Sequence, residues 1–191
     1  MIDKLISWDE EIFLKLNSIH ADWIDPVANI ISGNVVWIPL YIILIYFIYQ
    51  TDAKEIWWVL GGIALTILMA DQFTSGFMKP YFERLRPCHD PRWVEIVHTY
   101  KRCGGLYGFA SSHAANTFGV AIFLNLKMNG KIRYLTFLFL WASVVSYSRI
   151  YLGVHYPLDI LVGGMVGLIA GFISWILIVF IRREIFKFIL R

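Results

Sequence analysis

Apolar residues run in blocks of fifteen or more through this chain of 191 residues. A helix of roughly 20 residues matches the hydrocarbon core of a bilayer, which is about 30 Å thick. Apolar residues make up 58% of the sequence and charged residues 16%, a balance that excludes an ordinary soluble domain. The sequence therefore predicts an all-α, polytopic membrane helix bundle that forms one domain over residues 1–191.

Five blocks are long enough to cross a membrane. Gly33 and Pro39 interrupt the first block, which membrane helices tolerate where neighbouring groups satisfy the backbone. A polar segment, 79–109, follows the second block and is rich in Pro, Gly and charge. The predicted bounds of the five crossings are 27–49, 56–78, 111–126, 132–147 and 157–181.

The first residues follow a different pattern. Within residues 1–24, apolar side chains recur at helical spacing from Ile2 to Ile19, between the charged residues Asp3, Lys4, Asp9, Glu10, Glu11 and Lys15. This pattern predicts an amphipathic interfacial helix on the membrane surface, and the charges argue against a cleavable signal peptide. The bundle then has five crossings, or six if this helix also inserts.

Five crossings bring three polar segments to one face of the membrane: the loop after the second crossing, the start of the third, and the junction between the fourth and fifth. Ionisable residues at membrane depth cost a few kcal/mol each unless they are paired, so they are functional candidates by default. The candidates that the three segments collect on this face are Lys79, Arg86, His113, Arg149, His155 and Asp159. They predict a single site, with residues 79–109 as its loop.

Lys79, Arg86 and Arg149 converge on this face without matching acids, which predicts a phosphate bound between them. A basic residue near a membrane can instead extend to the headgroups and bind nothing specific. We favour this alternative for the other basic residues of the loop, Arg84, Arg92, Lys101 and Arg102. The formal charge of +3, without a basic run, predicts no nucleic-acid partner.

His155 and Asp159 lie four residues apart at the start of the fifth crossing, and therefore on one helix face. The carboxylate can accept the ring N–H and leave the other ring nitrogen able to attack. His113 follows Ser111 and Ser112 at a helix start, where hydroxyls cap and backbone N–H groups favour an anion. We predict one histidine as nucleophile and the other as general acid; a simple backbone hydrogen bond is the alternative for either.

Metal catalysis usually requires several carboxylates or histidines at ligand spacing, and this face has none, so we predict no metal and no cofactor. Asp71, within the second crossing, has two possible roles. It either makes a buried hydrogen bond to a neighbour, Gln72, Thr74 or Ser75, or it pairs with a cation of the site.

Two further features concern how the site is held. Cys88 and Cys103 bracket the polar loop and form a disulfide if the compartment is oxidising, which the sequence leaves open. Gly163, Gly167 and Gly171 recur every four residues on the fifth crossing and predict close packing of that helix against its neighbours, with a dimer face as the alternative.

Three segments together resemble the motifs of the type 2 phosphatidic acid phosphatase superfamily, which usually read KxxxxxxRP, PSGH and SRxxxxxHxxxD. They are Lys79 with Arg86-Pro87, the run Ala110-Ser111-Ser112-His113, and Ser148-Arg149 with His155 and Asp159. The resemblance implies that His155 forms a phosphohistidine, that Asp159 orients it, and that His113 protonates the leaving oxygen and then activates water. It also implies a phosphate held, without a metal, by Lys79, Arg86, Ser111, Ser112 and Arg149.

Ala110 and Ser112 depart from this pattern, since the family usually has Pro and Gly there. A side chain replaces the freedom of glycine, whereas the backbone N–H near the phosphate is kept. We expect the change to alter substrate preference more than activity.

The chain is thus predicted to be an integral membrane lipid phosphatase that hydrolyses a phosphate monoester or diphosphate. Undecaprenyl diphosphate, lipid A phosphates, phosphatidylglycerol phosphate and phosphatidic acid are the candidate substrates. A lipid-phosphate binding or transport protein, or a phosphotransferase with an acceptor other than water, is the alternative. Apart from Lys79, Arg86 and Arg149, Lys and Arg number six on the loop side and eight on the other, which favours a site that faces the periplasm or exterior. We expect the chain to lie in a bacterial inner membrane.

Overall fold

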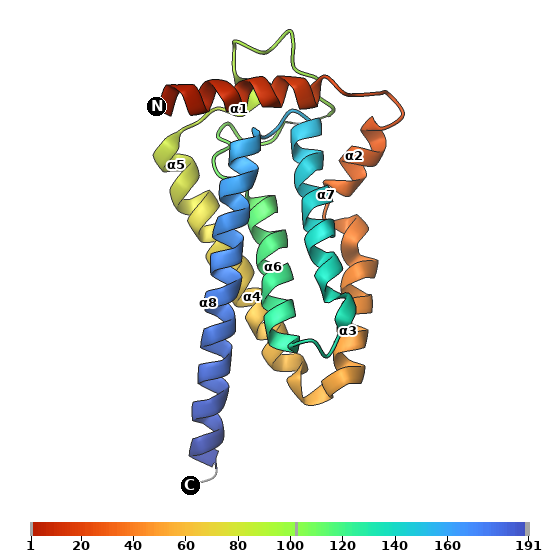
Figure 1. Cartoon of the computed structure of the whole chain (residues 1–191), viewed down its shortest axis with the longest axis vertical. Coiled ribbons are helices and arrows are strands. Elements are labelled where there is room, and N and C mark those ends of the chain that lie inside the picture. The colour runs from red at the N-terminus through yellow and green to blue at the C-terminus, as the bar shows by residue number, and fades with distance from the viewer. Residues whose placement is uncertain (1, 102, 190–191) are drawn as a thin grey trace.

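The computed structural model describes residues 2–101 and 103–189, and helices dominate this part of the chain (Figure 1). Short 3-10 turns and a π-helical stretch, Gln72–Met78, join or extend the α-helices. The predicted all-α class is confirmed, because within the described residues the sole strand-like pairing is one bridge between Leu85 and Tyr107. The α-helices are α1 (Ile2–Asn17), α2 (Asp25–Ile31), α3 (Ile38–Asp52), α4 (Ile56–Asp71), α5 (Lys79–Phe82), α6 (Ser112–Met128), α7 (Phe137–Tyr151) and α8 (Pro157–Ile189).

Helix α1 lies across one end of the bundle, over the starts of α6 and α8 and the end of α7 (Figure 1). Phe13 is fully buried and packs edge-on against Tyr156 with ring centroids 5.1 Å apart, whereas Leu5, Trp8 and Ile12 are exposed. The predicted amphipathic helix therefore forms, with one face on the protein and an apolar face left for the membrane surface.

The apolar stretches keep their predicted places but not all their bounds. The first predicted crossing, 27–49, is not one helix: α2 ends at Ile31, and Gly33 and a 3-10 turn, Val35–Trp37, precede α3. Pro39 in the first turn of α3 is compatible with a helix start there, because an N-terminal residue needs no intrahelical N–H bond. The second crossing is longer than predicted and continues through the π-helical stretch into α5.

Two helical stretches, Val35–Phe82 and Pro157–Phe188, are long and apolar enough to cross a membrane. Exposed large apolar side chains cover the outer surface of the bundle, as in Ile42 and Ile43 of α3 and Leu168 and Ile169 of α8. Such a surface suits a lipid environment and is unusual for a soluble bundle. The total number of crossings remains a prediction.

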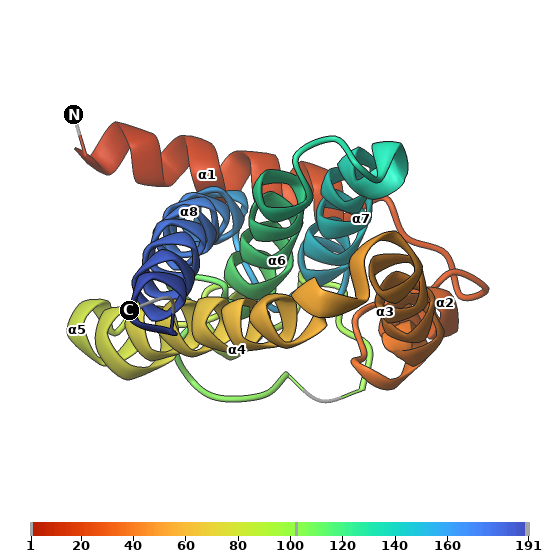
Figure 2. The same cartoon turned by 90° about the horizontal axis from the view of Figure 1, so that it is seen from below.

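Close packing of α6 against α8 forms the centre of the bundle (Figure 2). A side-chain carbon at Gly163, Gly167 or Gly171 would clash with backbone atoms of α6, at Ser111, Ala115 and Gly119 respectively. The predicted glycine stripe therefore seats α8 on α6, the helix whose start carries His113.

Helix α7 lies four to five residues further along the chain than the predicted 132–147. The segment Arg133–Thr136 forms a 3-10 turn, and the helix continues to Tyr151, so Arg149 lies in its last turn. Gly153, with φ of +70°, then reverses the chain, and the N–H groups of Val154 and His155 both donate to the carbonyl of Arg149. This tight connection brings Arg149 and His155 to the same end of the bundle.

Candidate active site

The start of α6 is fixed to the start of α8 by backbone and cap hydrogen bonds. Ser111 is fully buried and caps α6, with its hydroxyl accepting from the N–H of Ala114 at 3.5 Å. The N–H of Ser111 donates to the carbonyl of Asp159 at 3.0 Å. The predicted N-cap is confirmed, and free N–H groups in the first turn of a helix favour an anion at this helix start.

Lys79 reaches the same helix start from α5. Its ammonium donates to the hydroxyl of Ser112 at 2.5 Å and to that of Ser75 at 3.0 Å. The hydroxyl of Ser112 also lies 2.9 Å from that of Thr74. The serine that replaces the family's usual glycine is thus the residue to which Lys79 is tied.

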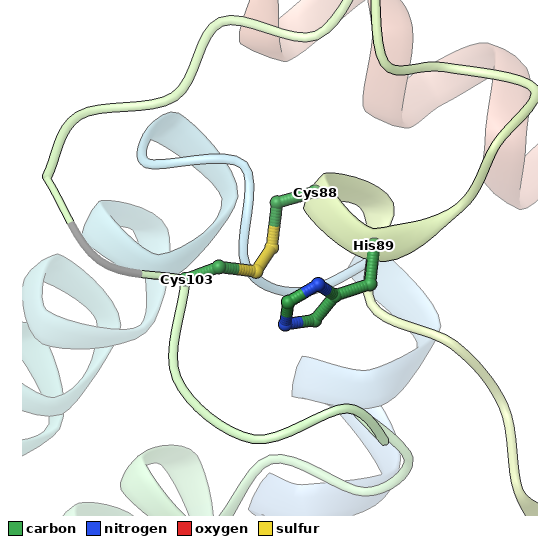
Figure 3. Close-up of side chains that lie close together, drawn as sticks. All are labelled: Cys88, His89 and Cys103. Carbon is green, nitrogen blue, oxygen red and sulfur yellow. A yellow bond between two sulfur atoms is a disulfide. The ribbon is translucent and has the colours of Figure 1, made fainter.

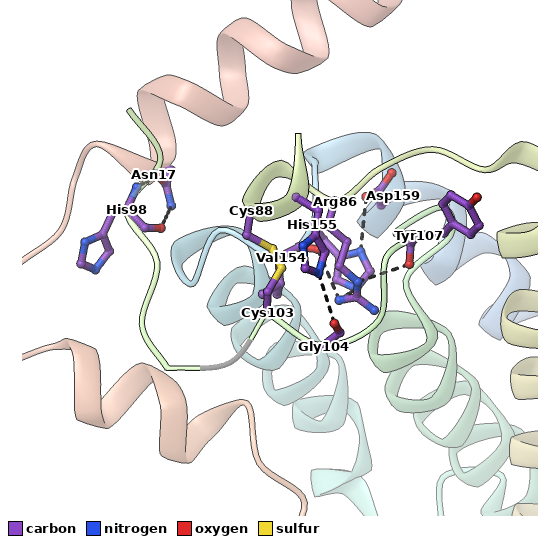
Figure 4. Close-up of a disulfide and its surroundings, with 11 residues drawn as sticks. Asn17, Arg86, Cys88, His98, Cys103, Gly104, Tyr107, Val154, His155 and Asp159 are labelled. Carbon is purple, nitrogen blue, oxygen red and sulfur yellow. Dashed lines mark hydrogen bonds and ion pairs between the residues drawn. A yellow bond between two sulfur atoms is a disulfide. The ribbon is translucent and has the colours of Figure 1, made fainter. Parts of the chain in front are cut away.

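Arg86 lies between the loop and His155 (Figure 4). Its Nε donates to the carbonyl of Tyr107 at 3.2 Å, and its Nη1 lies 3.4 Å from both the carbonyl of Val154 and Nε2 of His155. The backbone N–H of Arg86 also donates to the carbonyl of Leu106, in the later part of the loop, at 3.1 Å. The guanidinium is therefore held against the outward ring nitrogen of His155.

His155 and Asp159 form the predicted pair. Nδ1 of His155 lies 3.3 Å from Oδ2 of Asp159, and the N–H of Tyr156 donates to the same oxygen at 3.0 Å. Both residues are buried, at 1% and 0% exposure. Burial, together with the nearby charges of Arg86, Arg149 and Lys79, holds the pKa of His155 well below its usual range, so the ring is neutral.

Arg149 and His113 are the remaining predicted site residues. Arg149 bonds to the hydroxyl of Ser32 through Nη1, and its buried Nε has no partner among residues 2–101 and 103–189. His113 is close enough to Arg149, Arg86 and Lys79 for their charges to act on it, and His155 is also nearby. All eight predicted site residues therefore gather at one end of the bundle, around the starts of α6 and α8.

A cavity of about 560 Å³ opens onto this site from within the bundle. Its walls are mostly apolar and come from α3, α4, α6 and α7, with Tyr41, Ile63 and Trp141 among them. Ser112 and His113 lie in its wall at the site end, beside Asp71. The cavity therefore joins a polar end to an apolar interior.

The sequence prediction for Arg84 is wrong, because this side chain is not simply extended to the headgroups. Nη1 of Arg84 donates to Oδ1 of Asp159 at 2.9 Å, and Nη2 donates to Oδ2 of Asp9 at 2.6 Å. The sequence contains one signal of this contact, Asp9, which is an acid on α1 with no base three or four residues away.

Arg92 also has specific partners, contrary to the prediction. It pairs with Glu10 at 2.7 Å and with Asp90 at 2.6 Å, which ties α1 to the loop a second time. Lys101 lies over the ring of Tyr100 at 5.5 Å. The prediction for Arg102 lies outside the described residues.

Cys88 and Cys103 are joined by a disulfide, with Cα atoms 6.1 Å apart (Figure 3). His89 lies beside it, with Nε2 3.2 Å from the carbonyl of Gly104. The two sulfurs and the ring lie close enough together to hold a metal ion, but sulfurs bonded to each other provide no thiolate ligand. The disulfide instead closes residues 88–103 of the polar loop, and Arg86 lies two residues before this closed segment.

Residues 55–183 match the PAP2 superfamily, a segment that contains every predicted site residue. The chain belongs to the PAP2 superfamily. The three motifs, at Lys79, Ser111 and Arg149, lie within the matched segment, whereas α1 lies outside it.

Relatives in this superfamily are lipid phosphatases. The chain is 36% identical to the lipid A 4'-phosphatase of Porphyromonas gingivalis, with 89% of this chain and 72% of the relative covered. It is 38% identical to the lipid A 4'-phosphatase of Bacteroides thetaiotaomicron, with coverage of 92% and 78%. The PAP2 protein described here is therefore a membrane-associated hydrolase that acts on phosphate esters of lipids.

Solved PAP2 structures share the fold. The crystal structure of LpxE from Aquifex aeolicus has a TM-score of 0.60 and 26% identity, with 86% of this chain and 92% of that chain covered. A transmembrane PAP2 phosphatidylglycerolphosphate phosphatase from Bacillus subtilis has a TM-score of 0.64 and 22% identity, with coverage of 90% and 84%. These likenesses confirm the predicted membrane helix bundle.

Proposed function

We propose that this PAP2 protein hydrolyses a phosphate monoester of lipid A through a phosphohistidine on His155. The observation that carries the proposal is the alignment of three groups: Asp159 at Nδ1 of His155, 3.3 Å away, and Arg86 at Nε2, 3.4 Å away. The ring nitrogen that would attack phosphorus thus faces a cation that would hold the phosphate.

In the first step, Nε2 of His155 attacks phosphorus, and the bond between phosphorus and the ester oxygen breaks. Asp159 accepts the hydrogen bond of Nδ1–H and stabilises the positive charge that the ring acquires. His113 donates its proton to the leaving alkoxide, which departs as the lipid alcohol. In the second step, His113 takes a proton from water, and the resulting nucleophile releases inorganic phosphate from His155.

Lys79, Arg86 and Arg149 hold the phosphate oxygens, together with the N-terminal end of α6 at Ser111 and Ser112. Charge spreads over these oxygens in the transition state, so fixed cations around them lower the barrier. The buried Nε of Arg149, without a partner among the described residues, supports this role because a ligand oxygen would satisfy it.

The cavity supports a lipid as the substrate. Its apolar walls reach from His113 past Ile63 to Ile48, deep among the helices that face the membrane. An acyl chain placed there would stay in apolar surroundings while the phosphate meets the cations.

Acceptor groups beside His113 support a sugar monoester over a prenyl diphosphate. Asp71 lies in the cavity wall, and Oδ1 of Asn116 is buried there with no partner within the part of the chain that the structure describes. These groups would accept hydrogen bonds from hydroxyl or amide donors on a leaving sugar. A leaving prenyl phosphate would bring negative charge toward the carboxylate of Asp71.

The disulfide supports a site on the outer face of the membrane. Disulfides persist in oxidising compartments such as the periplasm, and Cys88–Cys103 closes the active-site loop. The basic residues Lys127, Arg182 and Arg183 lie at the other end of the bundle, which is the expected orientation for cytoplasmic residues.

The release of inorganic phosphate from lipids by the purified protein, measured in EDTA, tests this function. We expect lipid A to release inorganic phosphate faster than undecaprenyl diphosphate or phosphatidic acid, and His155→Ala to abolish release while it still binds lipid A. If the unmodified protein and His155→Ala bind lipid equally and the unmodified protein releases no phosphate, the result would support a binding or transport protein instead. Phosphate found on a second lipid and not in water would identify a phosphotransferase.

A further inference from the structure

Helix α1 contacts the active site although it lies outside residues 55–183, the part that matches the superfamily. Asp9, on the inner face of α1, is 6% exposed and uses both carboxylate oxygens. Oδ2 accepts from Arg84 at 2.6 Å, and Oδ1 accepts from the backbone N–H of Leu158 at 2.7 Å. The second bond reaches the first turn of α8, one residue from Asp159.

Arg84 connects Asp9 to Asp159. Its Nη1 donates to Oδ1 of Asp159 at 2.9 Å, and its guanidinium lies 4.0 Å from the ring of Tyr156. A planar guanidinium held by two carboxylates and an aromatic face has little rotational freedom. Its position is therefore set by α1 on one side and by α8 on the other.

Asp159 is fully buried, and its two oxygens have separate partners. Oδ1 faces Arg84, whereas Oδ2 faces His155 and the N–H of Tyr156. A carboxylate without solvent contact stays ionised only if cations and hydrogen bonds compensate for its lost hydration. Arg84 provides that charge and fixes which oxygen is turned to the histidine.

We propose that Asp9 and Arg84 are positioning residues, through which the surface helix α1 orients Asp159 and hence the attacking ring of His155. The proposal rests on the phosphatase function proposed above. It gives α1 a part in the reaction in addition to its contact with the membrane. Neither residue touches the substrate, so their loss should lower kcat and leave KM nearly unchanged.

Asp9→Asn tests the proposal with Glu10→Gln as a matched control. Glu10 is the next residue of α1 and also pairs with a loop arginine, Arg92, but this pair does not contact Asp159. With lipid A in detergent micelles as the probe, we expect Asp9→Asn to lower kcat about tenfold, as loss of a partner that orients a histidine ligand does in metal sites. Glu10→Gln should keep kcat within about twofold, since surface ion pairs contribute little.

Asp9→Asn in an Asp159→Asn background separates a positioning role from general damage to the fold. If Asp9 acts through Asp159, then Asp9→Asn has no further effect there, because the effects of coupled residues do not add. Arg84→Lys should retain more kcat than Arg84→Gln, since it keeps the charge. Equal kcat for Asp9→Asn and Glu10→Gln would overturn the inference, provided that the wild-type protein is active. The inference would also fail if Asp9→Asn lowered kcat as much in the Asp159→Asn background as in the wild type. An inactive wild type would instead overturn the proposed function.

Discussion

The ammonium of Lys79 donates a 2.5 Å hydrogen bond to the hydroxyl of Ser112, the residue that replaces glycine in the second motif. A second hydroxyl, that of Ser75, accepts from the same ammonium at 3.0 Å. An ammonium has three N–H donors, so one remains for a phosphate oxygen. Ser112 thus orients Lys79 at the start of α6, and the departure from the motif becomes part of the site.

Ser112→Ala should therefore weaken substrate binding. Ser75 still holds Lys79, so we expect KM for lipid A to rise about fivefold, equivalent to about 1 kcal/mol for one hydrogen bond, with kcat little changed. Steady-state kinetics of Ser112→Ala and of the Ser75→Ala, Ser112→Ala double variant measure this, and the double variant should show the larger KM. A lower KM for Ser112→Ala would mean that the hydroxyl competes with phosphate for Lys79.

The neutral state of His155 has a consequence for pH. Burial and the surrounding cations lower its pKa from the usual 6.5, so the folded protein binds the proton less well than the unfolded chain. The neutral ring therefore contributes stability that is present above pH 6.5 and is lost as the pH falls through the folded pKa. In 15N NMR of the phosphate-free protein, the signal of this ring should show a neutral imidazole at pH 6.

Assignment of that signal uses His155→Gln, in which it must disappear. A midpoint at or above 6.5 would contradict the effect of burial.

The disulfide should support the phosphate site as well as the fold. Arg86 is held by the carbonyls of Leu106 and Tyr107, which follow Cys103 closely, and the N–H of Cys88 donates to the carbonyl of Gly153 at 3.0 Å. Loss of the bond frees a loop of about 15 residues, with an expected cost of about 3 kcal/mol. We expect the Cys88→Ser, Cys103→Ser variant to have a lower Tm and a higher KM.

Dithiothreitol should produce the same two changes in the unmodified protein and neither in the double variant. An unchanged KM after reduction would mean that the backbone hydrogen bonds alone hold Arg86.

The motif residues are predictable from the sequence because charge at membrane depth is costly and these charges lie at the ends of apolar blocks. The apolar pattern predicts Arg149 in a junction, whereas α7 continues through it to Tyr151, since helix bounds depend on where packing ends. The contacts of Arg84 with Asp9 and Asp159 join residues 75 positions apart, and no local pattern encodes such a pair. The cavity was also beyond prediction, because it depends on how α3 and α4 diverge from their joining turn (Figure 1).

Filling the cavity should separate lipid substrates from soluble ones. Ile63 lines the cavity from α4, whereas Leu68, on the same helix, is 57% exposed and does not line it. Ile63→Trp places a larger side chain in the space proposed for an acyl chain. We therefore expect KM for lipid A to rise about tenfold, which corresponds to the loss of roughly 1.4 kcal/mol of apolar contact. Leu68→Trp should leave that KM unchanged. Hydrolysis of p-nitrophenyl phosphate, which has no acyl chain, should be equal in both variants; a parallel loss with both substrates would place the acyl chains outside this cavity.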